Sequence, residues 1–125
     1  MPDSEKEKVM QYLLLIYQNE AHRPTTPEGN HKLFTEYGEF TQSIIKSGNF
    51  KAGDGLQPVS SATTVRVRDG KAVTTHGPFA ETHEVLIGYY LVDAKDLDEA
   101  TAMAARIPSA KTGSIEVRPT LVYNK

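Results

Sequence analysis

Two segments of this chain are apolar on both faces of the strand that each is expected to form, and they constrain the fold more than any other feature. These segments are Met10–Tyr17 and Val85–Val92. Successive side chains of a strand point to opposite faces, so a strand with one face in water alternates apolar and polar residues. Neither segment alternates in this way. Both are therefore predicted to lie inside a sheet that is covered on its two faces.

Two amphipathic helices are predicted to supply part of that cover. The first follows an N-cap at Asn30 and ends at Gly48. The second has its N-cap at Asp96, a capping-box glutamate at Glu99 and a stop at Pro108. Apolar residues recur at helical spacing in both segments, so each helix is expected to bury one stripe against the sheet.

Turn residues divide the remaining chain. Asp69-Gly70 is a preferred pair for a two-residue hairpin, which predicts strands at Thr63–Arg68 and Lys71–Thr75. The segment Asn49–Ala62 contains two glycines and a proline and is predicted to be an irregular connection. Ser114–Tyr123 is predicted to close the chain as a strand, with Leu121 and Tyr123 on its apolar face. Pro119 marks an unpaired edge of this strand or the end of its pairing.

The resulting order, β-α-β-β-β-α-β, predicts an α+β fold of the ferredoxin-like sandwich type, an antiparallel sheet with two helices on one face. The other face would carry the second apolar side of both central strands, which is too large a patch for a soluble monomer. We expect a homodimer whose sheets pack face to face, which makes a barrel-like core with a cavity between the subunits. In the alternative, Asn49–Ala62 and the N-terminal tail fold over that face.

Composition narrows the class of protein. The 125 residues suit a single domain, 1–125, with residues 1–8 as a polar N-terminal tail that does not resemble a signal peptide. The chain has no cysteine, so thiol chemistry and disulfides are excluded. Its net charge is −2, and the longest apolar run is Tyr12–Tyr17. We therefore expect a cytoplasmic protein without direct contacts to nucleic acid or membrane.

The segment His76–Glu84, HGPFAETHE, closely resembles the signature of the YCII-related family, in the subgroup named for the peptide DGPFAETKE. Similar residues follow in the right order, so the resemblance extends from about Leu33 to Leu121: Gly88–Tyr90, Asp96–Ala100, Ala105–Pro108 and Glu116–Pro119. It implies a dimeric α+β barrel. Two positions depart from the signature, because His76 replaces an aspartate and His83 a lysine. The histidine of a His–Asp pair proposed in other relatives falls near Glu36, so that pair is not carried over.

The signature segment holds the candidate catalytic residues Glu81, His83 and Glu84. A carboxylate that faced an apolar cavity would have a raised pKa and would suit general acid–base catalysis. Alternatively, Glu81 and Glu84 accept backbone hydrogen bonds or pair with an arginine and shape the loop. The spacing of His76 and His83 is not that of a diagnostic metal motif, so no metal is expected.

Other residues are candidates for binding a ligand. Arg118 and Arg66 offer fork-shaped cations suited to a carboxylate, although Arg118 could instead pair with Glu81 or Glu84. The remaining candidates are His76, Phe79, Asp54 and Tyr90. Asp54 lies in a glycine-rich turn, where its side chain could simply bond its own backbone.

These observations predict a protein that binds a small polar or aromatic molecule in a cavity at the dimer interface, with acid–base catalysis left open. The alternative is a non-catalytic sensor or accessory module linked to transcriptional regulation, since members of the resembled subgroup often accompany sigma-factor-like regulators. The expected partners are a second copy of the chain and an unidentified small molecule. No cofactor is expected.

Overall fold

The computed structural model describes residues 9–122. The predicted polar tail, 1–8, and Tyr123 lie outside these residues. Along the described chain the helices and strands are β1 (Met10–Gln18), η1 (Glu20–His22), α2 (Pro27–Lys46), β2 (Phe50–Gly55), η2 (Val59–Ser61), β3 (Thr63–Arg68), β4 (Lys71–His76), β5 (Val85–Ala94), α3 (Leu97–Arg106), η3 (Pro108–Lys111) and β6 (Ser114–Pro119).

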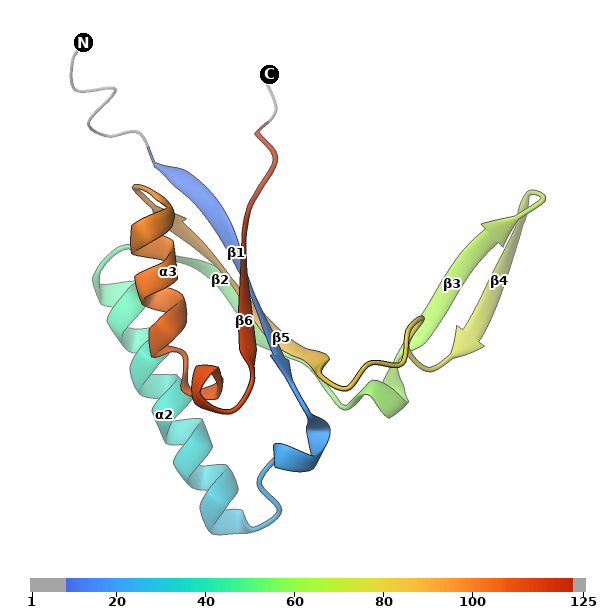
Figure 1. Cartoon of the computed structure of the whole chain (residues 1–125), viewed down its shortest axis with the longest axis horizontal. Coiled ribbons are helices and arrows are strands. Elements are labelled where there is room, and N and C mark those ends of the chain that lie inside the picture. Colours follow the sequence, from blue (N-terminus) through green and yellow to red (C-terminus); the bar gives the residue numbers. More distant parts are fainter. Residues whose placement is uncertain (1–8, 123–125) are drawn as a thin grey trace.

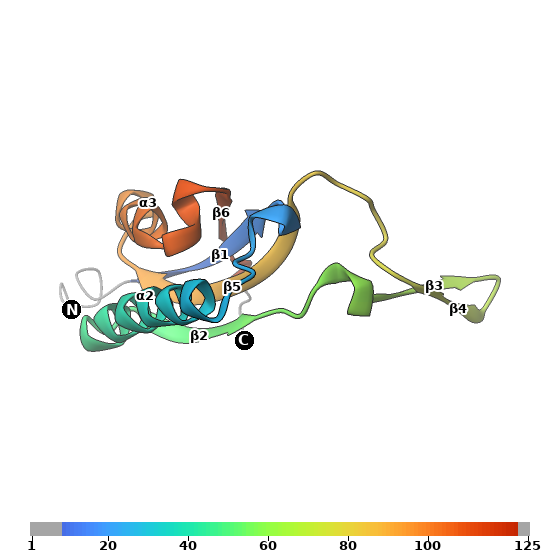
Figure 2. The ribbon, with the colours of Figure 1, turned by 90° about the horizontal axis from the view of Figure 1, so that it is seen from below.

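Four strands form an antiparallel sheet in the order β2-β5-β1-β6, and α2 and α3 lie side by side on one face of it (Figures 1 and 2). The apolar strands β1 and β5 occupy the centre, as the sequence predicts. The arrangement is an α+β fold consistent with the ferredoxin-like class. Its core lies between the helices and the sheet, where Leu14, Val92 and Ile44 are fully buried.

Both helices have the predicted kind of cap, but α2 begins earlier than the sequence predicts. The prediction of Asn30 as its N-cap is wrong. Thr26 is the N-cap, because its hydroxyl accepts the Gly29 N–H at 3.0 Å and Pro27 occupies the first turn. Gly48 follows the helix with a φ of 84°, as expected of a C-terminal glycine. In α3, Asp96 accepts the Glu99 N–H at 2.9 Å, which confirms that cap.

The prediction that Asn49–Ala62 is irregular throughout is wrong, because residues Phe50–Gly55 form the edge strand β2 along β5. Glycines concealed this strand in the sequence. A Cβ built on Gly53 would lie 2.6 Å from Cδ1 of Tyr90, so the close approach of the two strands requires glycine there. Residues 50–55 therefore extend the sheet and do not fold over the face that the helices leave uncovered.

Strands β3 and β4 form a separate two-stranded ribbon, which we call the arm. Asp69 and Gly70 have φ values of 53° and 77°, which confirms the predicted hairpin turn. Among the described strands, those of the arm pair with each other and with no third strand. Figure 1 places the arm on the side of the sheet opposite to the helices, projecting away from the body.

No helix of the described part of the chain lies over the second face of the sheet. We call it the open face, and the pairing register assigns to it Leu13, Leu15, Tyr17, Leu86, Tyr89 and Leu91. All six are partly exposed. At the edge of the sheet, β6 ends at Pro119 and not at Tyr123, and Leu121 is 78% exposed, so its predicted place on a buried strand face is wrong. Proline ends the strand because it has no N–H to donate.

Candidate functional site

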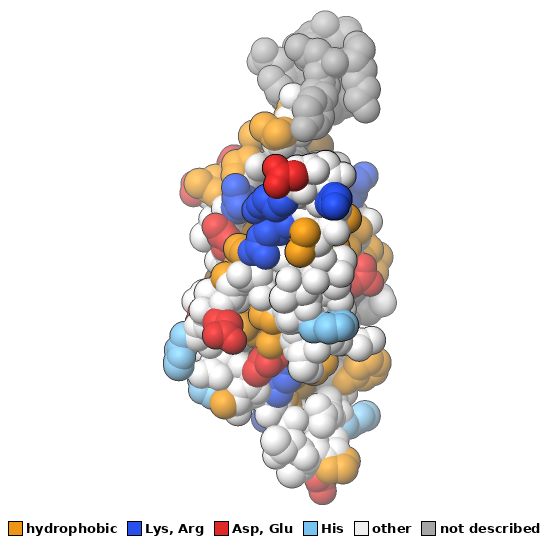
Figure 3. All heavy atoms as spheres, turned by 90° about the vertical axis from the view of Figure 1, so that its right-hand side faces the viewer, with side chains coloured by type: hydrophobic (Ala, Val, Ile, Leu, Met, Phe, Trp, Pro, Cys, Tyr) orange, Lys and Arg blue, Asp and Glu red, His pale blue; other side chains and the backbone are white. Residues whose placement is uncertain are grey.

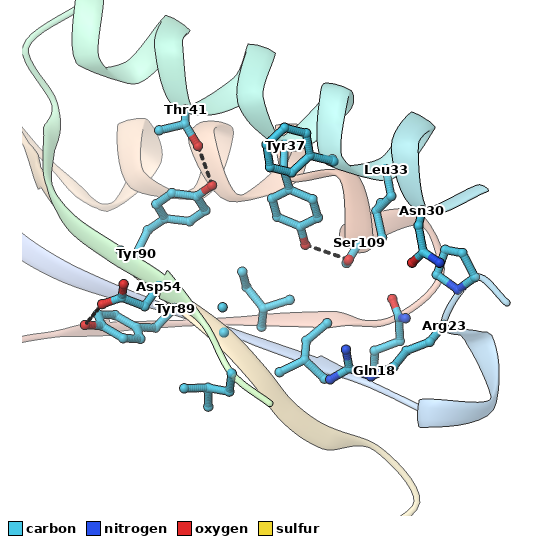
Figure 4. Close-up of a pocket in the computed structure, with 18 of the residues that line it drawn as sticks. Gln18, Arg23, Asn30, Leu33, Tyr37, Thr41, Asp54, Tyr89, Tyr90 and Ser109 are labelled. Carbon is cyan, nitrogen blue, oxygen red and sulfur yellow. Dashed lines mark hydrogen bonds between the residues drawn. The ribbon is translucent and has the colours of Figure 1, made fainter. Parts of the chain in front are cut away.

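A pocket of about 490 Å³ lies within the chain, between the N-terminal half of α2 and the sheet (Figure 4). This volume is in the range of small-molecule binding sites. The walls are mainly apolar, formed by Ile16, Leu33, Phe34, Phe50, Leu56 and Ile87. The pocket is on the helix side of the sheet, whereas the sequence predicted a cavity between two subunits.

Small residues on the sheet leave this space open. Gly53 of β2 and Gly88 of β5 both line the pocket. A Cβ on Gly88 would lie 3.0 Å from the backbone oxygen of Asp54, so a side chain there would crowd the neighbouring strand. On the opposite wall, Leu33, Tyr37 and Thr41 follow at intervals of four along α2 and therefore share the face turned to the sheet.

Arg23 provides the cationic group of the pocket. Its Nε and Nη2 atoms are enclosed and have no hydrogen-bond partner among the described residues. Nε lies 4.0 Å from Oε2 of Glu20, which is too long for a hydrogen bond. The same Glu20 oxygen accepts the N–H of Val59 at 3.0 Å. These two nitrogens are covered but make no hydrogen bond, although the Arg23 side chain as a whole is 35% exposed. Leaving such groups unpaired is costly, so this edge of the guanidinium favours an anionic partner.

Neutral polar groups lie near Arg23. Gln18 is 4% exposed, and its Oε1 accepts the hydroxyl of Thr112 at 2.9 Å. Figure 4 shows Gln18 and Arg23 at the same end of the pocket, with Asn30 of α2 close by. This end of the pocket therefore combines one cation with amide groups, which is a common setting for recognition of a carboxylate.

Two tyrosine hydroxyls on the pocket wall are paired with other hydroxyls. Tyr37 donates to Ser109 at 2.6 Å, and Tyr90 and Thr41 are hydrogen-bonded at 2.6 Å (Figure 4). Burial raises the pKa of both phenols above the usual 10.0, although these hydrogen bonds act in the opposite direction. Both tyrosines are therefore neutral at physiological pH and offer polar contacts, not a base.

Of the residues predicted from the sequence, Asp54 and Tyr90 line this pocket. The Asp54 carboxylate accepts the hydroxyl of Tyr89 at 2.9 Å, and this hydrogen bond is the main reason why the pKa of Tyr89 is raised. Tyr89 and Tyr90 are successive residues of β5, so their side chains point to opposite faces of the sheet.

The predicted catalytic residues lie outside the pocket, in the loop between β4 and β5. Glu84 accepts the hydroxyl of Ser114 at 2.8 Å, and Nε2 of His83 lies 3.3 Å from the Asn19 amide nitrogen. Glu81 is exposed. The contacts of Glu84 and His83 connect the loop to the ends of β6 and β1. The partner of Glu84 is a hydroxyl, whereas the alternative expected a backbone N–H or an arginine.

The remaining predicted ligand-binding residues are dispersed. Arg118 is exposed on β6 and pairs in register with Leu13, so it belongs to the open face. Arg66 and His76 lie on the arm, and Phe79, beyond it, is 78% exposed. The ion pairs found within residues 9–122, Arg23–Glu20 and Lys51–Asp93, do not include the predicted pairing of Arg118 with Glu81 or Glu84.

The sequence did not mark Arg23, Gln18 or Tyr37 as site residues. Arg23 stands in a polar loop before Pro24, and no local pattern distinguishes it from a solvated arginine. In the part of the chain that the structure describes, no three histidine or carboxylate side chains are grouped so as to hold a metal ion. None of the described helices has the length and apolar character needed to cross a membrane.

Comparisons with known proteins point to one family. The model of the YCII-related domain matches residues 10–124. An uncharacterized protein of Rhizobium meliloti (strain 1021) is 33% identical over 117 residues, which is 91% of this chain and 94% of that protein.

Proposed function

The chain belongs to the YCII-related family, and from that premise we propose that it binds a small organic carboxylate with an apolar or aromatic body in the pocket between α2 and the sheet. The observation that most strongly supports this proposal is the unpaired edge of the Arg23 guanidinium. Its Nε and Nη2 are adjacent N–H groups on one edge of the guanidinium, both enclosed and both without a hydrogen-bond partner in the described chain, with the Glu20 carboxylate 4.0 Å from Nε. A carboxylate accepts such a pair through its two oxygens, which satisfies both donors at once.

The rest of the pocket supports the apolar part of the ligand. Leu33, Phe50 and Ile87 would contact the body of the molecule, and its burial would supply much of the binding free energy. The hydroxyl pairs of Tyr37 with Ser109 and of Tyr90 with Thr41 offer additional polar contacts to a substituent. The ligand class is therefore a compact carboxylic acid with a ring or branched chain.

Binding without turnover is favoured over acid–base catalysis at this pocket. Among its described lining residues there is no histidine, and its carboxylate, Asp54, is already hydrogen-bonded to Tyr89. The two phenols of the wall have raised pKa values and are poor bases at neutral pH. This favours the sensor or accessory role predicted from the sequence. Catalysis through Glu81, His83 and Glu84 stays a prediction.

The proposal has two further parts: membership of a subgroup, which rests on the signature loop, and a homodimer, which rests on the open face. The sequence HGPFAETHE at His76–Glu84 supports membership of the DGPFAETKE subgroup. The apolar residues of the open face, Leu13, Leu15 and Leu91 among them, are only partly buried and support a homodimer in which two sheets pack face to face. A face-to-face sheet dimer would leave the pocket of each chain on the outer, helix side.

The proposed binding is tested with benzoate, phenylacetate and cyclohexanecarboxylate, each compared with its neutral amide, by thermal shift and titration calorimetry. We expect at least one acid to bind and its amide to bind at least tenfold more weakly, because the amide cannot accept both N–H groups of Arg23. Equal affinity for the acid and the amide would contradict the proposal, and so would failure of all three acids to bind.

Variants locate the site. Arg23→Gln removes the cation and is expected to abolish the preference for the acid, whereas the exposed Lys46→Gln makes the same charge change at the end of α2 and should leave binding as in the wild type. Arg118→Gln tests the location predicted from the sequence. If Arg118→Gln lost binding and Arg23→Gln retained it, the ligand would bind at the open face and not in the pocket.

A further inference from the structure

Within residues 9–122, the arm pairs with no other strand and buries none of the side chains from Val65 to His76. Its two strands are six residues each, and every side chain from Val65 to His76 is exposed. At its base, the N–H of Gly77 donates to Ala62 and the hydroxyl of Thr64 donates to Gly77. An isolated two-stranded ribbon is marginally stable in water, so an arm of this length needs a surface to pack on.

The two faces of the arm differ in character. Residues that are paired in register share a face, which places Val65 with Thr74 and Val67 with Ala72. Val65 and Val67 are 58% and 63% exposed. The other face carries Arg66, Arg68 and Lys71, and Figure 3, viewed from the side of the arm, shows Lys and Arg side chains gathered there. One face of the arm is thus apolar and the other basic.

We propose that the arm packs with its Val65–Val67 face against the body of a second copy of this chain. The inference rests on the proposed homodimer but not on the ligand pocket, and it adds to the sheet-to-sheet contact an element that reaches across to the partner. Each copy would hold the other with its own arm.

Charge is the first argument for a second copy. The arm carries three cations, Arg66, Arg68 and Lys71, against the single carboxylate of Asp69, and therefore has a net charge of +2. The whole chain has a net charge of −2, so everything outside the arm carries −4. Because these cations lie on the face opposite to the valines, they act at long range: the positive arm is attracted to the negative body of an identical molecule, and this attraction operates twice in a two-fold dimer.

The position of the arm also favours a second copy of the chain as its partner. The open face and the arm lie on the same side of the sheet, the side away from the helices (Figure 1). A partner that covers the open face therefore approaches from the direction in which the arm projects. A single partner molecule would then cover two exposed apolar surfaces, the leucines of the open face and the valines of the arm.

The test is the double variant Val65→Ser/Val67→Ser, with Val73→Ser as the matched control. Val73 lies on the basic face of the same ribbon and is 48% exposed. The dimer dissociation constant is measured by sedimentation equilibrium in low and high salt. The double variant removes four partly exposed valines from the dimer, so we expect its dissociation constant to rise about a hundredfold, with a much smaller rise for Val73→Ser.

Salt and hydrogen exchange give independent readouts. We expect salt to weaken the wild-type dimer, and the amides of β3 and β4 to be protected only at concentrations where the dimer forms. A dissociation constant for the double variant within threefold of the Val73→Ser value would overturn the proposal, as would a monomeric wild type. In either case the arm would bind a different partner, such as nucleic acid on its basic face. Loss of carboxylate binding with an intact dimer would overturn the proposed function alone.

Discussion

Gly53→Ala tests the packing that joins β2, β5 and the pocket. The added Cβ would lie 2.6 Å from Cδ1 of Tyr90 and 3.1 Å from the backbone oxygen of Tyr89. An ordinary contact needs about 1 Å more, and the Tyr90 ring is not free to move. It packs edge-on against Phe40 at 5.2 Å, and its hydroxyl is bonded to Thr41 at 2.6 Å.

The magnitude follows from two opposing effects. Overpacking a core of this kind costs about 1–3 kcal/mol, and replacing glycine by alanine in a strand returns about 0.5–1 kcal/mol through the unfolded state. We expect Gly53→Ala to lower the free energy of unfolding by about 1–2 kcal/mol, a fall of roughly 3–8 °C in Tm.

Urea denaturation followed by circular dichroism measures this change, and Gly55→Ala is the matched control. Gly55 lies on the same strand, has no heavy atom within 4 Å of an added Cβ and does not have a positive φ. It should therefore be neutral or slightly stabilised. Equal stability of the two variants would refute the reasoning, because the contact with Tyr90 is the difference between them.

Two further predictions concern the open face and the tyrosines. Leu15→Lys places a charge at the centre of the open face, so native mass spectrometry should find a monomer with unchanged circular dichroism; a persistent dimer would exclude the sheet-to-sheet contact. Because the folded-state pKa values of Tyr37 and Tyr90 are raised above 10.0, their contribution to stability is fully present below pH 10 and is lost as the pH rises beyond it toward the folded-state values. Tyr37→Phe and Tyr90→Phe should each reduce this alkaline loss in urea titrations at increasing pH, and an alkaline loss unaltered in both variants would show that other groups cause it.

The sequence predicted those parts of the fold that depend on local pattern. The Asp69-Gly70 turn, the Asp96 cap and the two doubly apolar strands were all identified from spacing and residue type, because each is determined by neighbours in the sequence. β2 was missed for a related reason. Its glycines are typical of a loop, and what makes it a strand is the close approach of Tyr90, a residue far away in the chain.

The candidate site was harder to predict because its chemistry arises from tertiary packing. Arg23 acquires its role only when the loop after β1 lies against α2 and the sheet, and when Glu20 is held by the distant Val59. Glu81, His83 and Glu84 drew attention because they crowd one short segment, yet crowding along the sequence did not place them at the pocket. Tyr90, by contrast, was predicted as a ligand contact and lies in the pocket wall.

The central claim is that Arg23 pairs with a ligand carboxylate inside the pocket. Its most direct test is a calorimetric cycle that combines a bound acid and its amide with the wild type and Arg23→Gln. The account predicts a coupling between the carboxylate and the guanidinium of about 1.5–3 kcal/mol, the range for hydrogen bonds to charged groups, so the acid should lose at least tenfold more affinity than the amide. Equal losses for the acid and the amide, or no loss for either, would contradict it.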